Sequence, residues 1–218
     1  MLKGFLFDLD GVIVDTAKYH FLAWKRLADD LKINFTIEDN ELLKGVSRMA
    51  SLDIVLGLGN LELSEDEKLT LATRKNEWYV DYITKMDSDE ILPGALDFLK
   101  EAKDKGIKVA LGSASKNAQT ILERLEITSY FDAIISGNEV SKAKPDPEVF
   151  LLGAKSVGLE PQECVVFEDA QAGVQAAINA GMKCIGIGEV SILGDADLVV
   201  DGLHAISVEN VLKIEVTN

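Results

Sequence analysis

Two acidic residues close the first apolar segment of the chain, in the stretch FLFDLDGVIVDT at residues 5–16. Asp8 and Asp10 come directly after apolar residues that are typical of a strand buried on both faces. A carboxylate at the end of a buried strand is costly, and a second carboxylate beside it raises that cost. A pair of this kind is therefore a candidate for chemistry.

Polar residues follow other apolar segments in the same way. In an open α/β sheet, ligands bind at the carboxyl ends of the strands, so residues in these positions are expected to converge. They are Ser113 and the SASKN loop after the segment 107–112, Glu168 and Asp169 after 164–167, and Lys144 ahead of an expected helix at 149–157.

These residue types suit phosphoryl transfer. Asp8, Glu168 and Asp169 offer hard oxygen ligands, which Mg²⁺ prefers, and a divalent cation would offset the clustered negative charge. Lys144 adds a further cation, and Ser113 offers a hydroxyl beside backbone N–H groups at a helix start, which suit a phosphate. A carboxylate, a metal, a lysine and a phosphate cradle together indicate transfer through an aspartyl phosphate.

Six short apolar segments, rich in Val, Ile and Phe, are predicted as strands. Helical patterns lie between most of them, with Gly or Pro at their ends. This alternation predicts a doubly wound, mainly parallel, Rossmann-like α/β sheet. The strands are expected at 3–10, 107–115, 131–137, 164–169, 183–188 and 197–200, and the helices at 93–106, 117–127, 146–158 and 172–181.

The segment 15–85 breaks this alternation, because it has helical patterns and no convincing strand. Phe21, Trp24, Ala28 and Leu31, for example, fall on one stripe of a helix. We therefore predict an α/β catalytic core formed by 1–14 and 86–218, with an all-helical cap domain, 15–85, inserted directly after the first strand.

The composition narrows the possible partners. The chain has 218 residues, 47% of them hydrophobic, and a net charge of −15 from 37 acids and 22 bases. So acidic a surface argues against nucleic acid and anionic membranes. With no apolar run near the ~18 residues of a membrane helix and no secretion signal, we expect a cytoplasmic monomer that acts on a small molecule. Cys164 and Cys184 are expected to be buried thiols.

The motifs resemble, in order, the four motifs of the haloacid dehalogenase superfamily. They are DLDGV at 8–12, Ser113, Lys144 and the pair Glu168-Asp169. The resemblance implies that Asp8 is the nucleophile that becomes phosphorylated. It implies that Asp10 is the general acid/base, with a backbone carbonyl that binds Mg²⁺. Ser113 and Lys144 would hold the transferring group, and Glu168 and Asp169 would complete the metal site.

The cap segment resembles one subfamily, which interconverts β-glucose 1-phosphate and glucose 6-phosphate through β-glucose 1,6-bisphosphate. The strings DGVIVDTAKYHFLAWK and LKGVSR carry this likeness. It implies that Arg48 clamps the distal phosphate and that His20 meets Asp10 or its peptide when the cap closes, with the bisphosphate as activating intermediate. The other substrate-binding residues that it implies are Thr16, Trp24, Gly45, Val46, Ser51, Lys75, Ser115, Lys116 and Asn117.

Alternatives remain at this point. Trp24 lies on an apolar stripe, which favours packing inside the cap over contact with the sugar. Lys75 is compatible with an ordinary solvated charge. A Mg²⁺-dependent sugar-phosphate phosphatase would share every core motif, and a non-catalytic sensor would not need both Asp8 and Asp10. A mutase needs a second phosphate site, so the distal basic residues favour the mutase.

Overall fold

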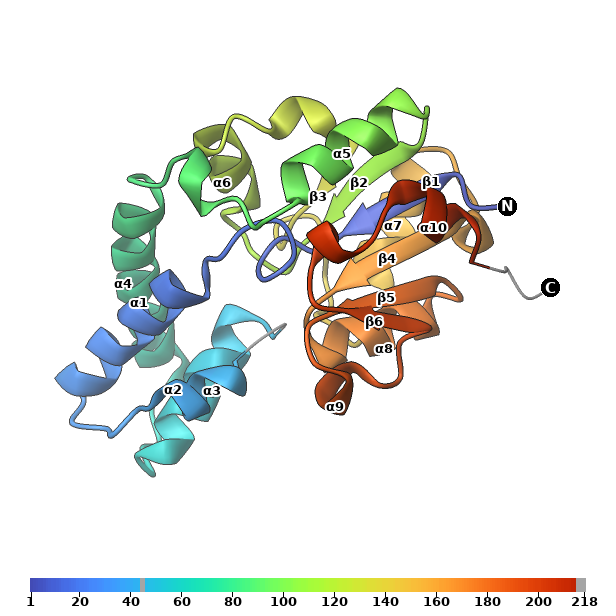
Figure 1. Cartoon of the computed structure of the whole chain (residues 1–218). Helices are drawn as coiled ribbons and strands as arrows, with labels where there is room; N and C mark the ends of the chain where they lie inside the picture. Colours follow the sequence, from blue (N-terminus) through green and yellow to red (C-terminus); the bar gives the residue numbers. More distant parts are fainter. Residues whose placement is uncertain (44–45, 215–218) are drawn as a thin grey trace.

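A computed structural model of the chain describes residues 1–43 and 46–214 (Figure 1). Its centre is a six-stranded sheet of order β3-β2-β1-β4-β5-β6, in which every neighbouring pair is parallel. This is the doubly wound α/β fold that the sequence predicts. The strands are β1 Gly4–Phe7, β2 Lys108–Gly112, β3 Ala133–Ile135, β4 Cys164–Glu168, β5 Lys183–Ile187 and β6 Leu198–Val200.

The strands are buried on both faces, as continuous apolar runs require. Phe5 and Phe7 of β1 belong to the apolar cluster on one face of the sheet, and Leu6 between them belongs to the cluster on the other. On the first face lie α5 Ala95–Asp104, α6 Ala118–Arg124 and α10 Val208–Leu212. On the second lie α7 Glu148–Ser156, α8 Gln171–Asn179 and α9 Val190–Leu193.

Between residues 15 and 85 the described part of the chain forms helices and no strand. We call this segment the helical insertion; the exact domain boundaries at 15 and 85 stay a prediction. Its helices lie to one side of the sheet (Figure 1) and enclose an apolar cluster of their own around Trp24 and Leu52. They are α1 Ala17–Asp30, α2 Ile37–Glu41, α3 Arg48–Leu58 and α4 Glu65–Ile83.

Two neighbouring chain segments connect the insertion to the core. Gly11 turns the outgoing segment in the left-handed region, at φ +80°, a conformation that favours glycine. The returning segment pairs with it through an antiparallel bridge between Val14 and Ile91, and Leu92 N donates to Ile13 O at 3.0 Å. The connection is thus a short two-stranded ribbon that begins three residues after Asp10.

In the described part of the chain, the remaining regular structure is four short 3₁₀ helices, at Ser88–Glu90, Thr128–Tyr130, Pro161–Glu163 and Leu203–Ala205. Both cysteines are buried and free, as expected. Among the described residues, no helix combines the length and the apolar character needed to span a bilayer.

Four phenylalanines interlock beneath the ends of β1 and β4. The Phe7 and Phe167 rings stack at 4.5 Å between centroids, and Phe98 of α5 contacts Phe5, Phe7 and Phe167 at 5.3–6.1 Å. Because Asp8 and Glu168 sit next to Phe7 and Phe167 in sequence, this packing fixes where the polar residues emerge.

Truncating Phe98→Ala is expected to lower the free energy of unfolding by about 3–5 kcal/mol, since it removes a buried ring and leaves a cavity. Urea denaturation followed by circular dichroism measures the loss. A fall below about 1 kcal/mol would contradict the packing described here.

Candidate active site

A buried ion cluster lies where β1 and β4 end. Phe7 pairs with Phe167 in the sheet register, so Asp8 and Glu168, one residue further on, are neighbours. Lys144 bridges them: its Nζ donates to Asp8 Oδ1 at 2.6 Å and to Glu168 Oε1 at 3.0 Å. The three residues are at most 7% exposed. The structure therefore confirms that Asp8, Lys144 and Glu168, which are far apart in sequence, lie together.

Burial and charge act against each other within this cluster. Burial opposes the ammonium of Lys144, but the Asp8 and Glu168 carboxylates outweigh it and hold the pKa of Lys144 above its usual value. Burial raises the pKa of Glu168 to about 7; Lys144 opposes that rise, and Asp8 adds to it. One lysine thus neutralises only part of the carboxylate charge. The remaining negative charge favours the binding of a further cation.

The carboxylates also have the geometry for that cation. One oxygen from each of Asp8, Glu168 and Asp169 lies within 4.8 Å of the other two. An all-oxygen, all-carboxylate set fits a hard cation such as Mg²⁺ better than zinc, whose sites are built mainly from nitrogen and sulfur ligands. The backbone N–H of Asp169 donates to Glu168 Oε2 at 2.7 Å, which orients the glutamate within the set.

Asp10 is not one of the three carboxylates of this set. The Thr16 hydroxyl donates to Asp10 Oδ1 across the turn at Gly11. Burial, with the nearby Asp8 carboxylate adding to it, raises the pKa of Asp10 to about 8. Asp10 therefore holds a proton at neutral pH, which is the state that a general acid needs.

The loop after β2 differs in one respect from the expected phosphate cradle. Ser113 is fully buried, and its hydroxyl accepts a hydrogen bond from Ser115 N at 3.1 Å. The Ser115 hydroxyl in turn accepts from Asn117 N at 3.2 Å. Two of the N–H groups predicted to be available at this helix start are thus bound to side chains, because Ser favours such local turns.

Lys75 is not the solvated charge that the sequence allowed. It is 2% exposed, with its Nζ 4.5 Å from the centre of the Trp24 ring and 4.8 Å from that of Tyr79. His20 Nδ1 lies 3.1 Å from the same Nζ, and the His20 ring stacks on Tyr79 at 4.1 Å. In this structure His20 therefore contacts Lys75, and the contact expected between His20 and Asp10 or its peptide when the cap closes stays a prediction.

The environment disfavours positive charge on this pair. Burial, reinforced by Arg48, lowers the pKa of Lys75 to about 7. Burial, reinforced by Lys75, lowers the pKa of His20 well below its ordinary value. Near neutral pH, His20 is uncharged and Lys75 is partly charged.

A cavity of about 440 Å³ is lined by residues of both the core and the insertion. Thr16 and Ser113 are fully buried beside it, and Gly45 lies outside the residues that the structure describes. Of the residues predicted from sequence, the following line the cavity: Asp8, Asp10, His20, Trp24, Val46, Arg48, Ser51, Lys75, Ser115, Lys116, Asn117, Lys144 and Asp169.

Sequence reasoning missed two residues of this region. Asn76 lines the cavity and its Oδ1 accepts from Asn117 Nδ2 at 3.0 Å, a direct link between the insertion and the core. Tyr79 is fully buried against both His20 and Lys75. A signal was present, since Tyr79 follows Lys75 by four residues and so shares its helix face.

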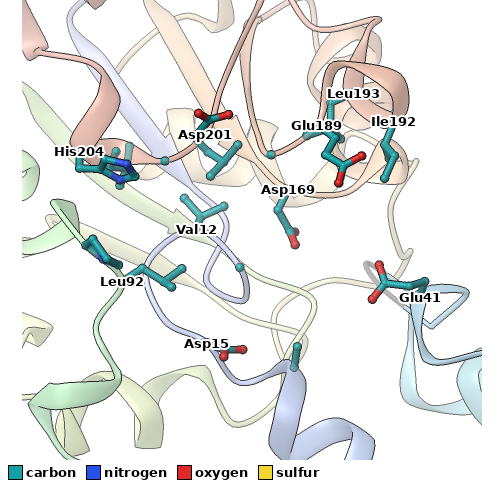
Figure 2. A pocket seen from close by; sticks show the side chains of 17 residues that line it. Val12, Asp15, Glu41, Leu92, Asp169, Glu189, Ile192, Leu193, Asp201 and His204 are labelled. Atoms are coloured by element: carbon teal, nitrogen blue, oxygen red, sulfur yellow. The ribbon is translucent and has the colours of Figure 1, made fainter. Parts of the chain in front are cut away.

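Figure 2 shows a second cavity, of about 380 Å³, which shares Gly11, Ala17 and Asp169 with the first. Its labelled charged residues are the core acids Asp169, Glu189 and Asp201 and the insertion acids Asp15 and Glu41, with His204 beside them. Carboxylates repel a phosphate, whereas the 440 Å³ cavity carries Arg48, Lys116 and Lys144. An anionic substrate therefore fits the 440 Å³ cavity better than the 380 Å³ cavity.

The fold and this site together define an α/β enzyme with a cluster of buried carboxylates at the carboxyl edge of a parallel sheet. The chain belongs to the haloacid dehalogenase-like hydrolase family, whose pattern matches residues 2–181.

Individual relatives agree with this assignment. The chain is 44% identical to a β-phosphoglucomutase of Bacillus subtilis over 201 residues, 91% of this chain and 89% of that protein. It is 30% identical to a phosphorylated carbohydrates phosphatase of Thermotoga maritima, over 92% and 91% of the two chains. The crystal structure of β-phosphoglucomutase from Clostridium difficile superposes with a TM-score of 0.94 at 43% identity, over 98% and 96% of the two chains.

Replacing Lys75→Met is expected to change how stability depends on pH. The native pKa of Lys75, about 7, lies below its unfolded value of 10.5, so the folded wild type carries a costly buried ammonium below pH 7. That cost fades as pH rises from 7 to 10.5, and the wild type should gain stability relative to Lys75→Met over this range. Urea titrations of both proteins from pH 6 to 10 test this, and a constant difference would contradict it.

Gly173→Ala is expected to weaken divalent-metal binding by about tenfold or more. A Cβ at Gly173 would stand 1.5 Å from Glu168 Oε1, and Glu168 cannot withdraw without giving up Lys144. Calorimetric titration of the apoprotein with Mg²⁺ measures the change. Gly57→Ala, in the last turn of α3 with no neighbour within 4 Å of the added Cβ, is the matched control. Equal affinity in both variants would refute the placement of Glu168 at the metal.

Proposed function

We propose that the chain is a β-phosphoglucomutase, which interconverts β-glucose 1-phosphate and glucose 6-phosphate through β-glucose 1,6-bisphosphate. The 44% identity to the Bacillus subtilis enzyme across nearly the whole of both chains supports this. The observation that carries the proposal is the arrangement of the 440 Å³ cavity. Asp8 and Lys144 lie in one part of it, and further bases, Arg48 from the insertion and Lys116 from the core, lie in its wall.

Asp8 is the nucleophile in this proposal. In one half-reaction a bisphosphate gives a phosphoryl group to an Asp8 oxygen, and the P–O bond to the sugar breaks. In the other, a hydroxyl of the bound sugar phosphate attacks the aspartyl phosphate and frees Asp8. Lys144, 2.6 Å from Asp8 in the resting site, is placed to hold the transferring group together with Ser113.

Asp10 moves the proton in both half-reactions. With its pKa at about 8 it starts protonated, and it gives that proton to the sugar oxygen that leaves the phosphorus. The resulting carboxylate then takes the proton of the attacking hydroxyl. The Thr16 hydroxyl, which donates to Asp10, holds the carboxyl clear of the metal ligands between these steps.

Asp8, Glu168 and Asp169 are the side chains that would hold Mg²⁺, with the backbone carbonyl of Asp10 as the family resemblance implies. When bound, the cation offsets the negative charge of the carboxylates and of the transferring group.

A mutase also requires a second phosphate subsite, because the bisphosphate must bind in two orientations. Arg48, Ser115, Lys116 and Asn117 are proposed to form it, since all four line the same cavity. Arg suits this role because its planar fork pairs with two phosphate oxygens at once. The hydrogen bond between Asn76 and Asn117 ties this subsite to the insertion and helps to exclude water.

The phosphatase remains the second candidate, supported by the 30% identity to the Thermotoga maritima enzyme. It differs in one step only, because water instead of a sugar hydroxyl takes the phosphoryl group from Asp8. The cytoplasmic location and the monomeric state expected from the sequence stay predictions.

One assay separates the two. The protein is incubated with Mg²⁺, β-glucose 1-phosphate and a trace of β-glucose 1,6-bisphosphate, and ³¹P NMR follows glucose 6-phosphate and free phosphate. We expect isomerisation to exceed phosphate release at least about a hundredfold, since the site selects a hydroxyl of the bound sugar over water.

Asp8→Asn should abolish both products, because the amide is not a nucleophile. Free phosphate as the dominant product would overturn the mutase in favour of the phosphatase. If neither glucose 6-phosphate nor free phosphate forms, both enzyme hypotheses are overturned and the non-catalytic sensor is the hypothesis that stands.

A further inference from the structure

We propose that Lys142 is a capture residue at the edge of the substrate cavity, whose ammonium binds a phosphate of the sugar bisphosphate while that phosphate is outside the two fixed subsites. The inference rests on the proposed mutase function. Lys142 lines the cavity, yet its side chain is 69% exposed, so it stands where the cavity meets solvent.

The backbone at Lys142 is firmly anchored. The N–H groups of Ser141 and Lys142 both donate to Glu148 Oε2 at 2.8 Å, and the Ser141 hydroxyl donates to the same carboxylate. Glu148 is the first residue of α7, and its own N–H donates to Asp146 Oδ1 at 3.1 Å. The main chain is thus tied to a packed helix, and the moving part of Lys142 is its long side chain.

The ammonium of Lys142 forms a weak, solvent-exposed ion pair with Asp146 in this structure. Its Nζ lies 3.2 Å from Asp146 Oδ2, in a pair that is 69% and 30% exposed. Exposed ion pairs of this kind are weak, while a phosphate dianion offers more charge and more acceptor oxygens. Lys142 is therefore expected to exchange Asp146 for a phosphate that comes within reach.

The charge of the protein makes such a residue useful. The net charge of −15 repels a bisphosphate, which carries about −3 to −4. Two cavity lysines have limited charge to offer, because Lys144 is bound to Asp8 and Glu168 and Lys75 is buried with a pKa of about 7. Among the described cavity residues, this leaves Arg48, Lys116 and Lys142 as bases without a buried carboxylate partner.

The place of Lys142 suits retention of the intermediate. Arg48 comes from α3 of the insertion and Lys116 from the loop after β2, whereas Lys142 comes from the segment between β3 and α7. When the bisphosphate turns, each phosphate leaves one fixed subsite before it enters the other. A flexible cation at a third point of the rim keeps the anion in the cavity during this exchange.

The first test compares Lys142→Gln with the wild type. Two quantities are measured: kcat/KM for β-glucose 1,6-bisphosphate as activator, and the rate at which the bisphosphate escapes into solution. Loss of one cation near the phosphate is expected to lower kcat/KM about fivefold at low ionic strength and to increase escape. The defect should shrink as salt is added. Lys142→Arg should retain most of the effect, and Lys155→Gln, at an exposed site on α7 outside the cavity, should match the wild type.

The second test removes the resting partner. Asp146→Asn keeps an oxygen for the N–H of Glu148 but frees the ammonium, so kcat/KM should rise, and this rise should vanish in the double variant with Lys142→Gln. A Lys142→Gln enzyme equal to the wild type, or a gain from Asp146→Asn that persists without Lys142, would overturn the inference while the mutase stands. Absence of mutase activity in the wild type would instead overturn the proposed function and this inference with it.

Discussion

The ion cluster of Lys144 with Asp8 and Glu168 is the interaction on which the site depends. Buried charges are tolerated only when they are paired, and here one ammonium reaches two carboxylates from neighbouring strands. The parallel register of β1 and β4 places these carboxylates together, and the phenylalanines beneath them hold that register. Because one lysine leaves net negative charge, the same cluster is also suited to a divalent cation.

The second constraint is that Asp8 and Asp10, only two residues apart, have different surroundings. Asp8 lies against Lys144, whereas Asp10 is turned by Gly11 toward Thr16, and its raised pKa keeps a proton on it. The connection to the insertion begins at this turn. Any rearrangement of the insertion relative to the core would therefore act on Asp10, the proposed proton carrier, and would couple enclosure of the cavity to the state of that carboxyl.

The sheet, its order of elements and the core cluster could be predicted because they depend on short-range patterns. Apolar runs of five residues mark buried strands, and polar residues at their ends must meet at one edge. Other features depend on tertiary contacts that no local pattern encodes. The sequence left Lys75 open between a substrate-binding residue and a solvated charge, because its burial between Trp24 and Tyr79 depends on how α1 and α4 pack. The Ser113 hydroxyl likewise satisfies a local N–H, a choice that spacing alone does not reveal.

The central claim is that phosphorylated Asp8 gives its phosphoryl group to a sugar and not to water. Rapid-quench measurement of the phosphoenzyme, formed from a labelled bisphosphate with Mg²⁺ present, tests it most directly. The account predicts slow decay in buffer and decay faster by at least about a hundredfold when β-glucose 1-phosphate is added, with the label recovered in sugar phosphates. Equally fast decay with and without the sugar phosphate, with the label in inorganic phosphate, would contradict it.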